Sequence, residues 1–277
     1  MPTTPRTPSA RTPDSASAPR TYLITGAASG IGKATAARLR AAGHTVIGAD
    51  RTADADGVAI AADLATDSGR TQLADQASEL SGGRLDAVIA CAGLAHFATT
   101  TVNVNYFGAV ATLELLRPLL AAGTDPRAAA VASVGAVHPT DPAIVDACLA
   151  GDEAAATAAA QHALDRGEGH LIYGSSKAAL ARWVRRAAVT DDWAGVGIPL
   201  NAIGPGTVLT PMTEGMLADP DVRKVVDTTV PMPLNGHARP EQIAPLLTWL
   251  TSPENTHVTG QFLFIDGGAE ALLRPTP

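Results

Sequence analysis

The hydrophobic and polar residues of this chain alternate in two patterns from Thr21 onwards. Short apolar runs predict β-strands near residues 21–25, 45–49, 58–61, 85–90, 128–133, 197–203 and 261–265. Longer amphipathic stretches between them predict helices near residues 31–42, 68–80, 101–121, 172–189 and 239–251. Because strands and helices that alternate in this way form βαβ units, we expect an α/β fold. Its core is a doubly wound parallel sheet of about seven strands, with helices on both faces.

The segment 139–169 interrupts this alternation. It contains two Ala-rich helical stretches that are separated at Gly151 and Asp152, a glycine followed by a good capping residue. We therefore predict a helical insertion directly before the helix near 172–189. Residues 21–277 as a whole are expected to form a single domain.

The first 20 residues, MPTTPRTPSARTPDSASAPR, differ in composition from the rest of the chain. They are rich in Pro, Ser, Thr and Arg and lack the apolar stretch of a secretory signal, so we predict a disordered tail. Their Arg and Ser content, with one acidic residue, is also typical of a transit peptide; the tail is our preferred interpretation. No apolar run is long enough to span a membrane, and we expect no membrane partner.

Composition and charge exclude several classes of function. The chain is 46% hydrophobic and 17% charged, as in globular proteins, and its net charge is −7 with scattered basic residues. This argues against nucleic-acid partners. The two cysteines, Cys91 and Cys148, lie far apart and lack metal-like spacing, which argues against a zinc site or a disulfide framework. We expect no bound metal and a cytoplasmic location.

A glycine-rich turn, TGAASGIG, connects the first predicted strand to the first helix. Gly26, Gly30 and Gly32 would let the backbone approach a pyrophosphate, and the helix N-terminus would offer unpaired N–H groups to it. A purely structural turn would also explain three glycines. Their position between a strand and a helix favours a dinucleotide site in a Rossmann-type fold.

The end of the second strand indicates which dinucleotide binds. Asp50 ends HTVIGAD, where this fold places the acid that binds the adenosine ribose. A carboxylate there accepts hydrogen bonds from free ribose hydroxyls and repels a 2′-phosphate, so we predict NAD. Arg51 is either a phosphate partner or a solvated surface residue. Asp63 could bind the adenine amino group or cap the helix that starts near Asp67.

The stretch LIYGSSKAAL places Tyr173 and Lys177 one helical turn apart. An ammonium near a phenol lowers the phenol pKa from its usual value of about 10, which suits proton transfer to or from an alcohol or ketone. This spacing also occurs by chance. Two further residues support it: Ser133 ends the fifth strand, at the edge where ligands bind, and Asn105 lies inside a long helix. An asparagine buried there would need a specific reason.

These motifs together resemble the short-chain dehydrogenase/reductase family over residues 21 to about 270. The resemblance extends to CAG at 91–93, NAIGPGTVLT at 201–210 and FIDGG at 264–268. It implies that Asn105 relays protons through water, that Ser133 orients the substrate oxygen, and that Tyr173 is the acid/base. It also implies that Lys177 lowers the Tyr173 pKa and holds the nicotinamide ribose.

The resemblance and the turn together predict the residues that contact the cofactor. We expect the chain to turn over the nicotinamide at 205–206, and the segment 207–238 to cover the substrate. The predicted cofactor contacts are Gly26, Ser29, Gly30, Ile31, Gly32, Asp50, Arg51, Asp63, Leu64, Cys91, Ala92, Gly93, Tyr173, Lys177, Pro205, Gly206, Thr207, Val208 and Thr210. The substrate-pocket candidates are Leu94, His96, Phe97, Gly135, Met212 and Met216. For His96 a solvated loop residue is our preferred interpretation, and ordinary packing beneath the covering segment would equally explain the apolar candidates.

The long step from Ser133 to Tyr173 resembles one branch of the family, the bacterial 3-alpha-hydroxysteroid dehydrogenases/carbonyl reductases. This implies an NAD-dependent oxidoreductase that interconverts a secondary alcohol and its ketone, on a hydrophobic cyclic or aromatic small molecule. Two features depart from the pattern: Ala90 and Cys91 replace the asparagines of the usual NNAG motif, and the segment between Gly93 and Asn105 is short. The first departure should cost local stability.

Other functions remain open. One is a dehydrogenase of an aromatic amino alcohol or a cyclic diol, which the short segment would permit. Another is a reductase of a carrier-bound acyl chain, against which the acidic net charge argues. A third, from another class, is an NAD-sensing regulator without turnover, which need not keep all four of the residues discussed above.

The resemblance also implies a homodimer or homotetramer. Family members usually pair through the helices that correspond to 101–121 and 172–189. The insertion directly precedes the second of these helices. We therefore expect a dimer built elsewhere, through 239–251 and the last strand.

Overall fold

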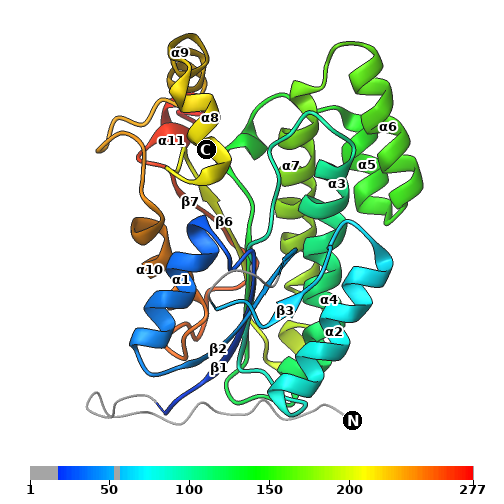
Figure 1. The fold of residues 1–277 in the computed structure, drawn as a ribbon, viewed down its shortest axis with the longest axis vertical. Coiled ribbons are helices and arrows are strands. Elements are labelled where there is room, and N and C mark those ends of the chain that lie inside the picture. Colours follow the sequence, from blue (N-terminus) through cyan, green and yellow to red (C-terminus); the bar gives the residue numbers. More distant parts are fainter. Residues whose placement is uncertain (1–17, 53–56, 277) are drawn as a thin grey trace.

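A computed structural model describes residues 18–52 and 57–276 (Figure 1). Its core is a seven-stranded parallel sheet in the order β3-β2-β1-β4-β5-β6-β7. The chain order reverses beside β1, so the sheet is doubly wound, as predicted. The strands are β1 (Thr21–Thr25), β2 (Thr45–Asp50), β3 (Ile60–Ala61), β4 (Ala87–Ala90), β5 (Arg127–Val131), β6 (Leu200–Pro205) and β7 (Phe262–Ile265).

Helices cover both faces of the sheet because side chains of each strand point alternately to the two sides (Figure 1). Tyr22 and Ile24 pack in one apolar cluster and Leu23 in the other. The first cluster includes residues of α1 (Gly30–Ala41) and α10 (Pro240–Leu250). The second includes residues of α2 (Asp67–Ser81), α4 (Ala109–Ala121) and α7 (His170–Ala187).

The insertion forms two helices, as predicted: α5 (Pro142–Ala150) and α6 (Glu153–Asp165). Gly151 ends α5 with a left-handed conformation (φ 74°), and the Asp152 side chain caps α6 by accepting from the amide of Ala155. α5 packs against both α6 and α7. Figure 1 shows the pair at the outer side of α7, so the insertion lies against the helix that follows it.

Several boundaries differ from the predictions. The expected helix at 101–121 divides into α3 (Thr100–Val102), a π-helical segment η1 (Asn103–Gly108) and α4. The strand expected at 197–203 begins only at Leu200, because Gly197 takes a left-handed conformation (φ 79°) and ends a short 3₁₀ turn, η3 (Ala194–Val196). Leu85 lies before β4, because its amide donates to the carbonyl of Leu119 at the end of α4.

The predicted covering segment, 207–238, contains α8 (Pro211–Ala218) and α9 (Pro220–Thr229), and neither helix has a buried residue. The remaining short helices are η2 (Val134–Val137) and α11 (Ala269–Leu273). Among the helices of residues 18–52 and 57–276, none has both the length and the apolar character to cross a bilayer.

The predicted disordered tail lies outside the described residues, except for residues 18–20. Its last residue, Arg20, belongs to the fold: it is buried, and its guanidinium donates to the backbone carbonyls of Asp86, Thr124 and Asp125. The ordered domain therefore starts before Thr21, where the apolar pattern begins.

Candidate active site

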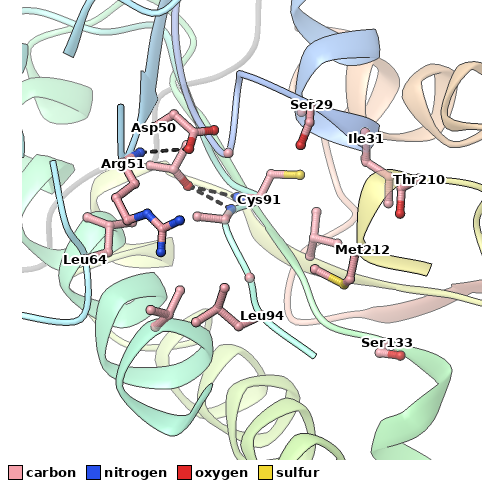
Figure 2. Close-up of a pocket in the computed structure, with 18 of the residues that line it drawn as sticks. Ser29, Ile31, Asp50, Arg51, Leu64, Cys91, Leu94, Ser133, Thr210 and Met212 are labelled. Atoms are coloured by element: carbon pink, nitrogen blue, oxygen red, sulfur yellow. Dashed lines mark hydrogen bonds between the residues drawn. The ribbon is translucent and has the colours of Figure 1, made fainter. Parts of the chain in front are cut away.

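A cavity of about 390 Å³ opens at the carboxyl ends of the central strands (Figure 2). This is the edge at which ligands bind in open α/β sheets. The structure brings together at its lining most of the predicted site residues: Gly26, Ser29, Gly30, Ile31, Gly32, Asp50, Arg51, Asp63, Leu64, Cys91, Ala92, Gly93, Leu94, Ser133, Tyr173, Lys177, Pro205, Gly206, Val208, Thr210 and Met212.

The glycine turn forms one end of the cavity, between β1 and α1. A Cβ atom on Gly32 would lie 2.2 Å from the carbonyl oxygen of Gly26, so only glycine permits this packing of helix on strand. Gly26 itself has φ +71°. Ser29 precedes α1 without capping its first turn, which leaves N–H groups of the helix start directed towards the cavity edge. This geometry fits a dinucleotide phosphate.

Asp50 is held in place at the end of β2. Its carboxylate accepts a hydrogen bond from the amide of Ala28, at 3.0 Å, and another from the amide of Arg51, at 2.7 Å. It therefore lies beside the glycine turn, as a ribose-binding acid must. The Arg51 side chain is exposed and extends towards Leu64 (Figure 2).

Thr25 supplies a contact that the sequence did not reveal. Its hydroxyl oxygen accepts hydrogen bonds from the amides of Cys91 (3.0 Å) and Ala92 (3.1 Å). The bonds fasten the segment after β4 to the end of β1, at the place where the family motif has asparagines. Burial raises the pKa of the Cys91 thiol to about 12, so this side chain remains protonated at neutral pH.

Asn105 is fully buried in η1 and does not line the cavity. Its amide oxygen accepts from the amide of Leu94 (2.8 Å), and its amide nitrogen donates to the Leu94 carbonyl (2.9 Å) and to the Ser176 hydroxyl (3.1 Å). A Cβ atom on Gly93 would lie 3.2 Å from the Asn105 side chain and 3.3 Å from the Lys177 nitrogen. Asn105 thus fixes the cavity wall at 93–94 against Lys177.

Ser133 and Tyr173 meet at the other end of the cavity. The Ser133 hydroxyl oxygen accepts from the amide of Gly135 (3.0 Å), which leaves its own proton free to donate. Gly135 packs between them, because its added Cβ would lie 3.2 Å from the Tyr173 ring and 3.3 Å from the Ser133 oxygen. Burial raises the pKa of Tyr173, and a hydrogen bond with Ser133 opposes this effect.

Lys177 is buried, and its ammonium donates to the carbonyl of Val131 at 2.8 Å. Burial lowers its pKa to about 8. That Lys177 lowers the Tyr173 pKa stays a prediction. Desolvation of the phenol has the largest effect and raises that pKa, while Ser133 supplies the opposing contribution.

The segment after β6 closes the cavity from above. A Cβ on Gly30 would lie 3.1 Å from the Thr210 methyl group, so this segment reaches back to the glycine turn. Thr207 is the one residue of the predicted stretch 205–208 outside the cavity lining. Its amide donates to the Met232 sulfur at 3.2 Å, and its carbonyl accepts from the amide of Ala238. The backbone of Thr207 therefore contacts other residues of the covering segment.

Four substrate-pocket candidates also lie outside the cavity lining. His96 is exposed, and Phe97 is 68% exposed and packs beside Gly169 at the end of the insertion. Gly135 lies behind the Tyr173 ring, and Met216 is half-buried in α8. In the short segment between Gly93 and Asn105, the apolar residues Leu94 and Val104 line the cavity, while Phe97 is exposed.

Several lining residues are small or apolar and carried no chemical signal in the sequence. They are Thr25, Ala49, Ala62, Ala65, Thr100, Val104, Val131, Ala132 and Thr213. Most of them lie near strand ends, and only that position could have identified them; Thr100, Val104 and Thr213 lie in helices, where no such signal exists. The described residues contain no group of three or more His, Cys, Asp or Glu side chains that could hold a metal ion.

Known proteins are similar to this chain along nearly its whole length. The family model described as enoyl-(acyl carrier protein) reductase matches residues 26–270. The chain is 38% identical to the 3-alpha-hydroxysteroid dehydrogenase/carbonyl reductase of Comamonas testosteroni, over 92% of this chain and 98% of that protein. It is 30% identical to the cis-4-hydroxycyclohexanecarboxylate dehydrogenase of Sinomonas cyclohexanicum, again over 92% and 98%.

A solved structure has the same architecture. The 3-alpha-hydroxysteroid dehydrogenase from Pseudomonas sp. B-0831, complexed with NADH, matches with a TM-score of 0.84 and 40% identity, over 93% of this chain and 99% of that one. The sheet order, the glycine turn and the cavity agree with these likenesses. The chain therefore belongs to the short-chain dehydrogenase/reductase family of oxidoreductases.

Proposed function

We propose that the protein is an NAD-dependent oxidoreductase that interconverts a secondary alcohol and its ketone. The observation that carries the proposal is the meeting of Ser133 and Tyr173 at one end of a cavity whose other end holds the glycine turn and Asp50. The hydroxyl groups of Ser133 and Tyr173 lie close together, so both can form hydrogen bonds with a substrate oxygen that gains or loses a proton. The buried Lys177 ammonium lies between these two ends.

The protein's own part in the reaction is to hold and move one proton. Ser133 donates a hydrogen bond to the substrate oxygen, because its contact with the Gly135 amide uses a lone pair and leaves the hydroxyl proton available. Tyr173 gives its phenolic proton to that oxygen when a ketone is reduced, and takes it back when an alcohol is oxidised. The raised pKa of Tyr173 keeps the phenol protonated at neutral pH, which favours its role as a proton donor. NAD, when bound, supplies the hydride acceptor or donor.

The cavity residues support NAD rather than NADP. Asp50 is a fixed carboxylate that can accept hydrogen bonds from ribose hydroxyls and that repels a 2′-phosphate. Arg51 lies next to it and is the one feature that would favour the phosphate. The Pseudomonas relative is complexed with NADH, which also supports NAD.

We propose a hydrophobic cyclic or aromatic substrate. Leu94, Val104 and Met212 give the cavity an apolar wall, and Met212 is directed into the space above Ser133 (Figure 2). The names of two relatives describe cyclic secondary alcohols, a hydroxysteroid and a hydroxycyclohexanecarboxylate.

Absorbance at the NADH band tests the proposal directly. The panel contains a 3-alpha-hydroxysteroid, an aryl ketone, an aryl amino alcohol, a cyclic diol and a 3-oxoacyl thioester, each with NAD(H) and with NADP(H). We expect turnover of the steroid or the aryl ketone, and at least tenfold higher kcat/KM with the cofactor that lacks the 2′-phosphate. Tight NADH binding without turnover of any compound would instead indicate a regulator.

A further inference from the structure

An ion pair between the buried Arg70 and the partly exposed Glu153 fastens the insertion to the rest of the domain. Arg70 also pairs with the exposed Asp67, at 3.0 Å. Arg70 of α2 is 5% exposed, and its guanidinium donates two hydrogen bonds to the Glu153 carboxylate, at 2.6 and 2.7 Å. Glu153 is the first residue of α6. A paired, two-pronged contact of this kind is geometrically specific, and a buried guanidinium without its partner is costly.

The same carboxylate holds the first residue of the π-helical segment. The Asn103 side chain donates to Glu153 at 2.6 Å and to Thr157 of α6 at 3.2 Å. Arg70 also donates to the Asn103 carbonyl at 3.3 Å. Both the side chain and the backbone of Asn103 are therefore held at the contact with the insertion.

The contact continues to the candidate active site through η1. Asn103 begins this segment, and Asn105, two residues further, fixes the backbone of Leu94 in the cavity wall. Arg70 contacts a second part of the cavity lining as well, because its Nε donates to the carbonyl of Leu64 at 2.8 Å. The ion pair thus joins α6 to two parts of the lining of the cofactor cavity. π-Helical segments such as η1 need tertiary contacts, since their hydrogen bonds are less favourable than those of an α-helix.

We propose that Glu153 is a positioning residue of the active site. Through Arg70 and Asn103 it holds η1 in register, so that Asn105 keeps the Gly93–Leu94 wall against Lys177. The insertion is then part of the scaffold of the site. The expected effect of Glu153 on turnover rests on the proposed oxidoreductase function. Its expected effect on the structure of η1 and the Gly93–Leu94 wall rests on the geometry alone.

Substitution Glu153→Ala tests the proposal. The insertion should remain folded, because α6 also packs through the buried Ala156, Ala160 and Ala163. We expect kcat for a 3-alpha-hydroxysteroid to fall at least tenfold, with KM changed less than threefold. Glu153→Gln keeps one acceptor for Asn103 and should recover part of the rate. Gln161→Ala, which removes an exposed pair with Asp165 on the same helix, is the matched control and should leave the rate unchanged.

A double substitution separates positioning from stability. In Glu153→Ala the buried Arg70 keeps only the exposed Asp67 as a charged partner. Arg70→Met with Glu153→Leu removes this guanidinium, so the melting temperature should return towards that of the wild type. We expect kcat to stay low, because Asn103 still lacks its carboxylate partner. A rate that recovers together with the melting temperature would show a merely structural role. A Glu153→Ala rate within twofold of the wild type would also overturn the proposal.

Hydrogen–deuterium exchange tests the contact without any substrate. In Glu153→Ala the amides of 94 and 103–108 should exchange at least tenfold faster than in the wild type, while β1 is unchanged. Unchanged exchange at 94 and 103–108 would overturn the proposal. If the wild type turns over no compound of the panel, the proposed function fails, and this exchange measurement still decides the role of Glu153.

Discussion

The Thr25 hydroxyl holds the backbone of the segment after β4, where Ala90 and Cys91 stand in place of the usual asparagines. It is 2% exposed and is the acceptor for two backbone amides after β4. The sequence could not show this contact, because the two segments are distant along the chain. The candidate catalytic residues were more predictable, since each combines a chemical type with a motif.

Replacing this hydroxyl tests its role. In Thr25→Val the two amides lose their acceptor in a buried place, so the free energy of unfolding should fall by roughly 2 kcal/mol. Urea denaturation measures the change. Thr25→Ser keeps the oxygen and should lie much closer to the wild type. Equal stability of the Val and wild-type proteins would show that the two amides do not depend on Thr25.

Lys177 should make stability depend on pH at alkaline values. Its pKa is about 8 in the folded protein against an ordinary value of 10.5, so between these values the unfolded chain binds more protons. Stability relative to Lys177→Met should therefore rise with pH through this window, by about 3 kcal/mol in total. This gain in stability should be lost again as the pH falls through about 8. Urea denaturation of both proteins from pH 7 to 10.5 measures this; a difference that stays constant contradicts the burial effect.

At the scale of elements, hydrophobic periodicity predicted the seven strands and the two inserted helices. It did not predict η1, because apolar spacing is nearly the same in an α-helix and a π-helical turn. The structure shows that Gly108 closes this segment against Leu64, with an added Cβ only 2.9 Å from the Leu64 side chain and backbone. Gly108 and Leu64 are brought together only in the folded protein, so the pattern of apolar residues along the chain could not predict this contact.

The junction of β1 and α1 requires glycine at one position in particular. Gly32→Ala places a methyl group against the Gly26 carbonyl, so we expect a loss of about 1–3 kcal/mol in stability and at least tenfold weaker NADH binding. Urea denaturation and NADH fluorescence measure these effects. Gly215→Ala in α8 meets no atom within 4 Å and is the matched control. An Ala variant at 32 that binds NADH normally would contradict this role of the turn.

At the scale of the whole molecule, the insertion covers part of the face that family members usually use to associate. α5 packs against α7, which leaves α10 and the last strand, β7, for a partner. Among residues 18–52 and 57–276, β7 pairs with β6 alone, and its own residues are half-buried. On α10, Trp249 is 37% exposed. We propose a homodimer through these elements.

Light scattering tests this arrangement. The wild type should have twice the mass of one 28.1 kDa chain, and Trp249→Glu should shift it towards a monomer because a charge would be buried in the interface. Leu115→Glu introduces the same charge on α4, at a residue that is 46% exposed, and should leave the dimer intact. Dissociation by the Leu115 substitution alone would place the interface on the other face.

The most direct measurement of the proposed mechanism compares Tyr173→Phe with the wild type. The substitution removes one oxygen from a buried ring that packs against Gly135 and leaves the cofactor end of the cavity unchanged. NADH fluorescence should give a dissociation constant within threefold of the wild type. Turnover of the preferred secondary alcohol should fall by about 100-fold or more, because the phenol that transfers the proton to and from the substrate oxygen is removed. A Phe variant that retains close to the wild-type rate would contradict the mechanism.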